Sequence, residues 1–320
     1  MVLDSLLILL GLAVLLVGGD LLVRGAVGLA AAMRIPPLLV SLTIIAFGTS
    51  APELVVSVTS VLEHEAGIAI GNIIGSNIAN VLLVLGLPAI IYPMSAHVQG
   101  LRRHGVAMLI ATAAFAAIAY SGRALEQTTG AALFAGIIVY VSFLALSARS
   151  TRGRDPVIDE VSEYSGGDKG NIGSTLIFLL AGLIGLPIGA HLLVTSGGSL
   201  AAALGVRPEL IGLTIVAFGT SLPELATVIA AAMHRKSDVA IGNVVGSNIF
   251  NIFAVGGAAG LAGVAEFTRP SLTLDIPVMI GSAVLLSAFI FLRKDIGRLA
   301  GFLMIAFYAI FILALAGGFG

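Results

Sequence analysis

The chain has 320 residues, of which 58% are hydrophobic and 10% charged, with a mean hydropathy of +1.10 and a formal net charge of −1. These values exclude a water-soluble globular domain, because most of the molecular surface must be apolar enough to face lipid. The absence of cysteine excludes disulfides, thiolate metal sites and cysteine nucleophiles.

Apolar segments long enough to cross a membrane follow one another along the whole chain. A spanning helix needs about 20 apolar residues, so roughly ten spans account for the chain and leave no room for a separate soluble domain. The N-terminus lacks a basic region and a cleavage motif, so the first segment is expected to be a retained span. The predicted spans are 5–32, 37–61, 68–92, 104–121, 130–147, 174–203, 209–233, 239–263, 275–292 and 297–317.

The second half of the chain repeats two polar motifs of the first half. The Gly-Thr-Ser-x-Pro-Glu motif that ends at Glu53 recurs at Glu224, and the Gly-Asn-x-x-Gly-Ser-Asn-Ile-x-Asn motif that ends at Asn80 recurs at Asn251. Glu224 follows Glu53 by 171 residues, and Asn251 follows Asn80 by the same number, so the second half of the chain is expected to be a duplicate of the first. We therefore predict an all-α integral membrane protein with one five-helix repeat at 1–147 and another at 174–320. The polar segment 148–173 is expected to be a solvated cytoplasmic connector, and a regulatory cation site on its acidic residues is the alternative.

The distribution of lysine and arginine predicts how the spans are oriented. With the N-terminus outside, most basic residues fall in inner loops, among them Arg102, Arg103, Arg235, Lys236, Arg293 and Lys294. The outer loops contain only Arg123, Arg207 and Arg269. This bias predicts that both termini lie outside the cytoplasm. Five spans per repeat then place the two halves upside down relative to each other, which is typical of secondary transporters with broken helices at a midplane site.

Two acidic residues in predicted spans, Glu53 and Glu224, are the strongest candidates for function. A charged side chain near the bilayer centre costs on the order of 2.5–3.5 kcal/mol, so such residues usually face a cavity or a partner. Pro52 and Pro223 precede them, and each removes a backbone hydrogen bond and frees carbonyls one turn back. Paired carboxylates with nearby hydroxyl and carbonyl oxygens favour a hard cation such as Ca²⁺, and the absence of His and Cys from the motifs disfavours transition metals.

Further candidates share the predicted helix faces of the two acids. Hydroxyl side chains precede each acid by three or four residues, alanine carbonyls lie one turn earlier, and a serine and an asparagine four residues apart share a stripe of the following span. These residues are Thr49, Ser50, Ala46, Ser76 and Asn80, with the repeat counterparts Thr220, Ser221, Ala217, Ser247 and Asn251. For any one hydroxyl, a bond back to the preceding turn is an equally good interpretation.

Other polar residues in the spans are interpreted structurally. Asn72, Asn77, Asn243 and Asn248 are expected to brace neighbouring backbone, and Gly71, Gly75, Gly242 and Gly246 to allow close helix packing. Asp20 and Arg24 are four apart and predict an ion pair along the first span. His191 occupies the Asp20 position of the second half and is expected to be an interior histidine with satisfied hydrogen bonds; a pH sensor is the alternative.

With both motifs present twice and in order, the whole chain resembles the calcium/cation antiporter superfamily, most closely its prokaryotic sodium/calcium exchangers. The resemblance implies that the second, third, seventh and eighth spans form the ion-binding core and that the first and sixth slide past it. It implies that Glu53 and Glu224 bind both ion types, that Thr49 and Thr220 complete a calcium site, and that Asn80 and Asn251 line the centre. The implied sodium sites comprise Ala46, Ser50 and Ser76 on one side and Ala217, Ser221 and Ser247 on the other.

The sequence departs from some members of that superfamily at the centre. Many carry Asp at one of the two positions that are Asn80 and Asn251 here, so potassium co-transport is not expected. The proton-coupled branch usually has Gly-Asn before the critical Glu, whereas this chain has Gly-Thr-Ser, which favours sodium. The expectation is therefore an antiporter that exchanges Ca²⁺ for Na⁺ by alternating access in a prokaryotic cell membrane, and H⁺/Ca²⁺ exchange on the same scaffold is the alternative.

Other classes of function fit the motifs less well. An intramembrane hydrolase that uses Ser50 or Ser221 would need a general base, and the motifs contain no His or Lys. Symmetric broken helices are typical of alternating-access transporters and disfavour a channel. The sequence has no phosphate-binding loop motif, which disfavours a transporter driven by ATP hydrolysis. We accordingly expect no enzymatic activity, no cofactor, no nucleic acid and no obligate protein partner.

Overall fold

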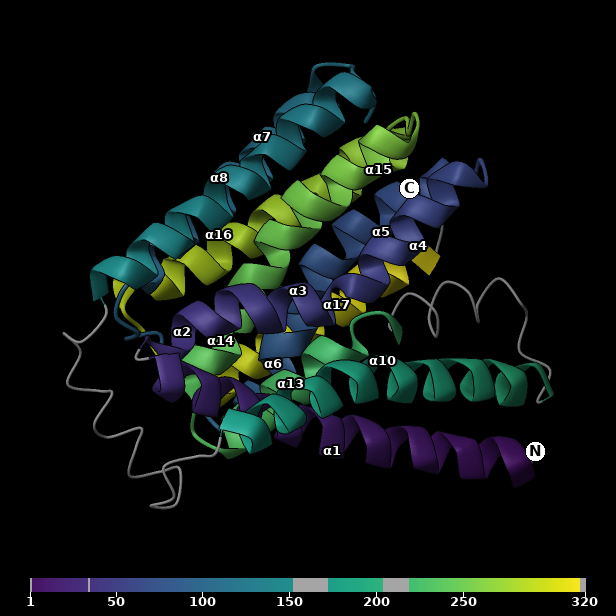
Figure 1. Ribbon diagram of the computed structural model, residues 1–320. Coiled ribbons are helices and arrows are strands. Elements are labelled where there is room, and N and C mark those ends of the chain that lie inside the picture. The colour runs from purple at the N-terminus through teal and green to yellow at the C-terminus, as the bar shows by residue number, and fades with distance from the viewer. Residues whose placement is uncertain (1, 34, 152–171, 204–218, 317–320) are drawn as a thin grey trace.

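The computed structural model describes residues 2–33, 35–151, 172–203 and 219–316, and every regular element within these ranges is a helix (Figure 1). Segments with π-helical hydrogen bonding are labelled η and interrupt four of the longer helices. The first half contains α1 (Val2–Met33), α2 (Pro37–Val40), η1 (Ser41–Ile45), α3 (Ala46–Thr49), α4 (Ala51–Leu62), α5 (Ala66–Ala79), η2 (Asn80–Leu85), α6 (Gly86–Ile91), α7 (Leu101–Tyr120) and α8 (Gln127–Thr151). The second contains α10 (Ile172–Ala203), α13 (Leu222–Met233), α14 (Ser237–Phe250), η4 (Asn251–Val255), α15 (Gly256–Ala262), η5 (Ser271–Asp275), α16 (Ile276–Leu292) and α17 (Arg298–Ala316).

The described helices include eight that are long and apolar enough to cross a membrane, or nine if the bent pair Pro37–Thr49 and Ala51–Leu62 is one span. The apolar helix α13 is shorter, with 12 residues. The first part of the predicted seventh span, 209–218, lies outside the described residues. The prediction of an all-helical multi-pass membrane protein is therefore confirmed, and the count of ten stays a prediction.

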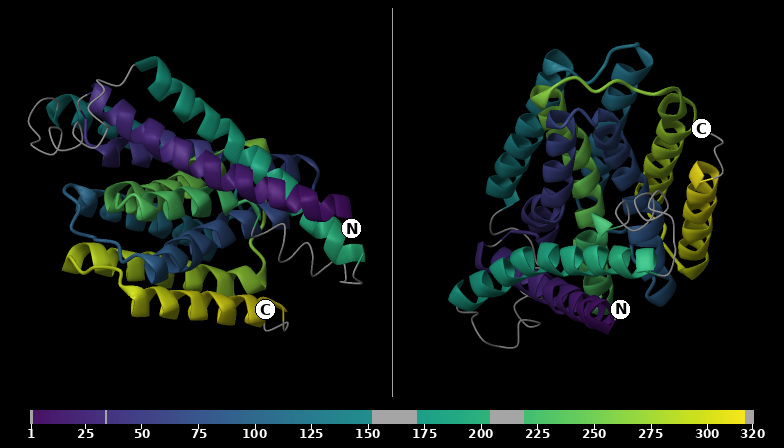
Figure 2. Two further views of the ribbon diagram at one scale, coloured as in Figure 1. Left: turned by 90° about the horizontal axis from the view of Figure 1, so that it is seen from below. Right: turned by 90° about the vertical axis from the view of Figure 1, so that its right-hand side faces the viewer.

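The long helices α1 and α10 lie side by side along one edge of the molecule (Figures 1 and 2). They are antiparallel, because Gly11 approaches Gly189 near one end of the pair and Gly25 approaches Leu179 farther along. A Cβ atom on Gly25 would lie 2.5 Å from the backbone nitrogen of Leu179, so the two backbones are in close contact. Small residues at a helix interface allow this approach in lipid, where tight packing replaces the hydrophobic driving force.

Contacts between the halves recur at the repeat offset with the roles of the halves exchanged. Met94 forms an isolated antiparallel bridge with Ile296, and Leu125 forms one with Ala265; both 265 minus 94 and 296 minus 125 give 171. Likewise α6 packs on α17, and their counterparts α15 and α8 pack on each other. Each half thus uses the same surfaces to hold the other half.

The third and eighth spans, α5–η2–α6 and α14–η4–α15, form the most buried part of the described structure. The eighth packs directly on the second span of the other half: a Cβ on Gly246 would lie 2.7 Å from the Cβ of Ala46. The Ser41 hydroxyl also donates to the Val239 carbonyl at 2.6 Å. These contacts bring the two repeated motifs of opposite halves together in the core.

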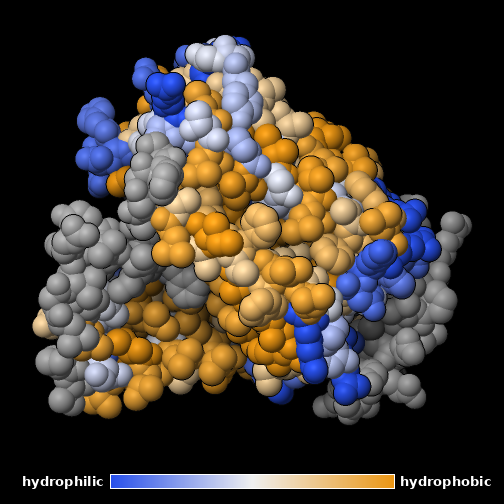
Figure 3. All heavy atoms as spheres, turned by 180° about the vertical axis from the view of Figure 1, so that it is seen from behind, coloured by the Kyte–Doolittle hydropathy of each residue, from blue (hydrophilic) through white to orange (hydrophobic). Residues whose placement is uncertain are grey.

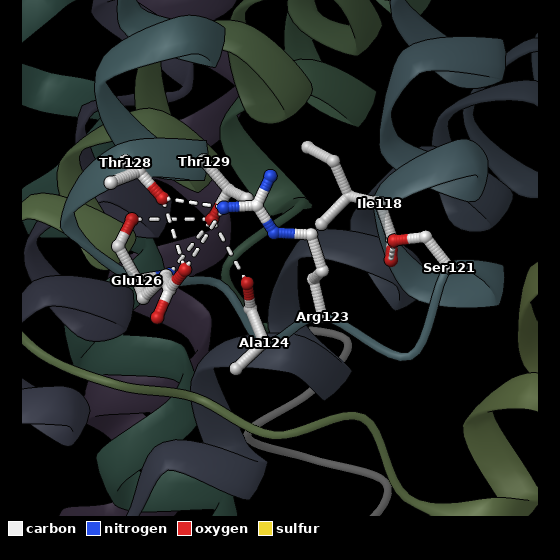
Figure 4. A network of polar contacts seen from close by, with 7 residues as sticks. All are labelled: Ile118, Ser121, Arg123, Ala124, Glu126, Thr128 and Thr129. Atoms are coloured by element: carbon white, nitrogen blue, oxygen red, sulfur yellow. Dashed lines mark hydrogen bonds and ion pairs between the residues drawn. The ribbon is translucent and has the colours of Figure 1, made fainter.

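The outer surface is apolar, with polar groups towards its margins. Figure 3 shows a broad hydrophobic face with hydrophilic residues gathered at its edges. One such polar margin is the turn before α8, where Arg123 pairs with Glu126 at 3.2 Å and the Thr129 hydroxyl accepts from the Glu126 N–H and donates to the Ala124 carbonyl (Figure 4). These bonds satisfy backbone groups at the start of a helix.

Candidate functional site

The second span is broken three residues before its acidic residue, and the described part of the seventh span has the same backbone angles at the equivalent position. Ser50 has φ −85° and ψ 4°, and Ser221 has φ −88° and ψ 3°, and new helices begin at the next residues. Pro52 and Pro223 stand second in these helices, where a missing N–H is tolerated. Because Pro52 has no N–H, it cannot bond to the Gly48 carbonyl four residues earlier. Both acids therefore lie in the first turn of a helix, where backbone N–H groups favour negative charge.

The carboxyl groups of Glu53 and Glu224 are buried at the centre of the structure. Their exposed fractions are 1% and 0%, and they are close enough to repel each other electrostatically. Ser50 Oγ donates to Glu224 Oε1 at 3.1 Å, which joins the first half to the second. Within the described residues, both oxygens of Glu53 and Oε2 of Glu224 have no hydrogen-bond partner. Unpartnered buried carboxylate oxygens are costly unless a cation or a proton neutralises them.

Hydroxyl groups from both halves surround the two acids. Thr49, Ser50 and Ser247 face the Glu224 carboxyl. Thr49, Ser50, Ser221, Ser76 and Ser247 are all buried. Ser221 Oγ has no partner among the described residues, whereas Thr220, half-buried beside it, does have interactions. The site therefore offers neutral oxygens next to the two carboxylates.

The central asparagines lie where the third and eighth spans change their winding. Asn80 begins η2 and Asn251 begins η4, and π-helical segments of this kind are frequent at functional sites. Asn80 Nδ2 donates to Asn248 Oδ1 at 3.0 Å, which leaves Asn80 Oδ1 without a described partner. Both side-chain polar atoms of Asn251, which is fully buried, also lack one. These amides add further unused oxygens to the core.

The expected bracing by the other asparagines is confirmed for two of them. Asn72 Nδ2 donates to the Glu53 carbonyl at 3.1 Å and to Ser57 Oγ at 2.9 Å, so it fixes the backbone that carries the first acid. Asn248 Nδ2 donates to the Asn77 carbonyl at 3.4 Å.

Asn243 is a site residue that the sequence interpretation did not place among the candidates. Its Oδ1 accepts from the Thr49 hydroxyl at 3.5 Å, and its Nδ2 has no partner in the described part of the chain. The signal was present, since Asn243 repeats Asn72 and both precede the Gly-Ser-Asn of the motif.

The hydroxyls and the alanine carbonyl are arranged differently from the prediction. The helix break means that Ser50 meets the acid of the other half and not Glu53 on its own helix face. The Ala46 carbonyl is not released, because it accepts the Ser50 N–H at 3.0 Å and the Thr49 hydroxyl at 3.4 Å. The carbonyl that Pro52 leaves without its N–H is that of Gly48. Ala217 lies outside the described residues.

Among the remaining expectations, the ion pair on the first span is confirmed: Arg24 Nε lies 2.8 Å from Asp20 Oδ2. The interior position of His191 is wrong. Its side chain is exposed, because α10 packs on α1 at the edge of the molecule and turns this residue outwards. Gly242 and Gly246 pack closely as expected, whereas no described residue would lie within 4 Å of a Cβ on Gly71 or Gly75.

The chemistry available at the centre is that of a hard-cation site. In the described ranges, no group of three or more His, Cys, Asp or Glu side chains is suited to a resident metal ion. Two carboxylates surrounded by hydroxyl and amide oxygens can instead bind a cation that comes and goes, since Ca²⁺ accepts about 6–8 oxygen ligands in a flexible shell.

Comparison with known proteins gives the same picture. The family described as sodium/calcium exchanger protein matches residues 4–147 and again 174–317. The chain is 32% identical to the inner membrane protein YrbG of Escherichia coli over 318 residues, which cover 98% of this chain and 97% of that protein. It is also 32% identical to the sodium/calcium exchanger MaX1 of Methanosarcina acetivorans, with 98% of each chain covered.

A solved structure of the sodium-calcium exchanger NCX_Mj, soaked with 2.5 mM Na⁺ and 1 mM Sr²⁺, matches the fold with a TM-score of 0.84. The two sequences are 31% identical, and the match covers 98% of both chains. The buried carboxylate pair, the duplicated motifs and these matches agree, and the chain belongs to the sodium/calcium exchanger family of membrane transporters.

Proposed function

We propose that this chain is a secondary active antiporter that exchanges Ca²⁺ for Na⁺ by alternating access. The observation that carries the proposal is the pair of buried acids, Glu53 and Glu224, with three carboxylate oxygens that no described group satisfies. One divalent cation or several monovalent cations can neutralise such a pair, and a neutral site crosses a low-dielectric occluded state at lower cost. The two ion types then compete for the same oxygens, which makes their transport coupled.

The ligand set is proposed as follows. Glu53 and Glu224 contact every bound cation, and Thr49 and Thr220 complete the calcium site. Sodium uses Ser50 and Ser76 on one side, and Ser221 and Ser247 with the Ala217 carbonyl on the other. The Ala46 carbonyl is left out of the set, because it already accepts the Ser50 N–H and the Thr49 hydroxyl. Asn80 and Asn251 contribute to the centre directly or through water. Support comes from the burial of every described side chain in this set except the half-buried Thr220, and from the position of Ser50, which already reaches Glu224.

Sodium is preferred over the proton as the coupling ion because of the neutral oxygens. A proton needs only a carboxylate to bind, whereas Na⁺ needs several oxygen ligands beside it. The duplicated serines provide such ligands from both halves. H⁺/Ca²⁺ exchange remains the second candidate, since each unpartnered carboxylate could also be neutralised by a proton.

Ten spans in two inverted five-helix repeats give this mechanism its geometry. The antiparallel pairing of α1 with α10 and the exchanged contacts at the 171-residue offset support inversion. Together with the basic inner loops, this arrangement supports a topology in a prokaryotic cell membrane with both termini outside the cytoplasm. The site then lies between the halves, where rocking or sliding of one part exposes it to either side in turn.

The test is calcium uptake into proteoliposomes that contain the purified protein. An outward Na⁺ gradient and an outward H⁺ gradient are imposed separately at equal membrane potential. Uptake driven by Na⁺ alone supports the proposal. Uptake driven only by the pH gradient assigns the proton as the coupling ion, and uptake with neither gradient at full rate indicates a channel.

A further inference from the structure

One acid–histidine contact between the halves has no formed counterpart among the described residues. Asp20 on α1 lies 2.5 Å from Nε2 of His234, the residue that directly follows α13. The same carboxylate pairs with Arg24 through its other oxygen. The side chains of Asp20 and His234 are only about one-third exposed, at 33% and 39%. The pair therefore ties the first span of one half to the end of the broken seventh span of the other.

The repeat offset converts this pair into a second acid–histidine pair. Adding 171 to 20 gives His191, and subtracting 171 from 234 gives Glu63. The acid and the histidine have exchanged places, so His191 on α10 with Glu63 after α4 has the same chemistry as Asp20 with His234. The two exchanges compensate each other; either one alone would give an acid opposite an acid or a histidine opposite a histidine.

The backbone that would present this second pair is already formed. Glu63 has φ −86° and ψ 7° after α4, and His234 has φ −83° and ψ 4° after α13. The next residues, His64 and Arg235, both have positive φ, at 65° and 57°. Yet Glu63 and His191 are exposed, and no described contact joins them. The backbone turns after α4 and α13 are alike. Only one of the two acid–histidine pairs is formed because α1 and α10 are positioned differently relative to these turns.

The packing of the two helices agrees with that difference. α1 packs along α13 so closely that a Cβ on Gly19 would lie 2.7 Å from the Ala226 carbonyl oxygen, and α10 makes no comparable contact with α4. Ala226 is 6% exposed, whereas its counterpart Val55 on α4 is 61% exposed. Contacts such as the Met94 and Leu125 bridges occur in both copies at once, so they belong to a fixed scaffold. The contact of α1 with α13 occurs in one copy only.

We propose that Asp20–His234 and His191–Glu63 are reciprocal latches, each formed in one of the two access states. The inference rests on alternating access between inverted halves, as proposed above: when two halves exchange conformations, a contact made by one is made by its counterpart in the other state. In the state seen here α1 is latched to α13 at the inner side. In the opposite state α10 covers the Val55 face of α4, and His191 meets Glu63 at the outer side.

The second latch is expected to be slightly longer than the first. Ala190 replaces Gly19, so α10 must stay farther from α4 than α1 does from α13. Glu63 has one methylene more than an aspartate and can span the added distance. Partly exposed pairs of this kind hold weakly, because water screens them. A weak latch suits a transporter, which must open it in every cycle.

The test uses the absence of native cysteine, so that introduced thiols are the only ones. Two double variants, D20C/H234C and H191C/E63C, are treated in proteoliposomes with a reducible bifunctional thiol reagent, and linked peptides are quantified by mass spectrometry. The control is E63C/H234C, whose residues lie at the ends of α4 and α13 and are not paired in either state. Linking is measured without Na⁺ and Ca²⁺, and again during turnover with both gradients.

We expect D20C/H234C to link under both conditions, and H191C/E63C to link several-fold faster during turnover than at rest. Each link should stop exchange until a reductant is added, and the control should not link. Linking of H191C/E63C at the control level during turnover overturns the inference. A different result is that the protein does not exchange Ca²⁺ for Na⁺ while both double variants still link when other cations are supplied. That result contradicts the proposed transported ions, Ca²⁺ and Na⁺, and supports the reciprocal latches.

Discussion

The replacement of Glu53 by glutamine tests the centre of the proposed site most directly. Both carboxylate oxygens of Glu53 are buried and have no partner among the described residues, so the amide removes charge without breaking a protein hydrogen bond. It also removes the repulsion between Glu53 and Glu224. The ion-free variant should therefore be at least as stable as the wild type, although it no longer binds calcium well.

The loss of calcium affinity follows from the charge alone. Two unit charges about 4 Å apart interact by about 4 kcal/mol at an effective dielectric constant near 20, and calcium carries two charges. A loss of about 4 kcal/mol, taken as a lower bound, weakens binding by about a thousandfold, since each 1.4 kcal/mol is a factor of ten. At a calcium concentration of 100 times the wild-type Kd, the ligand stabilises the wild type by about 2.7 kcal/mol. The same concentration should leave the variant almost unstabilised.

The assay is thermal unfolding of purified protein with and without calcium, beside calcium exchange in proteoliposomes. E65Q is the matched control, because Glu65 is an exposed acid in the turn after α4 and outside the site. We expect E53Q to keep its ion-free Tm and to lose both the calcium-induced rise in Tm and exchange. A calcium-induced rise equal to that of the wild type, with exchange intact, would refute the assignment of Glu53.

Three further outcomes are expected. S76A and S247A should each weaken Na⁺ competition against Ca²⁺ more than they weaken Ca²⁺ binding. The control S287A, which replaces a buried serine on α16, should change neither. Equal sodium dependence in all three variants contradicts the proposed sodium sites. G246A should lower the free energy of unfolding by about 1–3 kcal/mol, because the added methyl group overpacks against the second span. G281A is the control and should not lower it, since no described atom lies within 4 Å of the added Cβ. Equal unfolding temperatures of the two variants contradict this expectation. The rate of sodium-driven exchange should respond to membrane potentials imposed with valinomycin. Two carboxylates balance one Ca²⁺, but more than two Na⁺ leave a net charge, and moving each charge across the membrane is worth about 2.3 kcal/mol per 100 mV. An unchanged rate indicates electroneutral exchange.

The sequence predicted the parts of the fold that depend on composition and local chemistry. The described spans lie within a few residues of the apolar segments, because burial in lipid requires apolar length. The breaks at Ser50 and Ser221 follow from the two prolines, whose missing N–H ends a hydrogen-bonded helix. Burial of both acids follows from their position within apolar spans.

Contacts that depend on how separate helices meet could not be predicted in the same way. The partner of Ser50 is Glu224, 174 residues away, and nothing in the spacing of the motif selects it over Glu53 on the next turn. The Asn80–Asn248 bond likewise needs the third and eighth spans to be side by side. The exposure of His191 depends on the side of α10 that faces α1, and the helix is apolar on nearly all sides, so periodicity gives no direction.

The sequence does not predict the asymmetry between the two halves, and this asymmetry bears on function. A duplicated sequence predicts a symmetric molecule, and most contacts between the halves are indeed paired, as the Met94 and Leu125 bridges are. A site between two symmetric halves would be equally open or equally closed to both sides, so a transporter at work must break the symmetry. The structure breaks it where α1 covers α13 and α10 leaves Val55 of α4 exposed. Under the proposed alternating access, this difference between the copies defines the conformational state, and the sequence of either copy alone does not contain it.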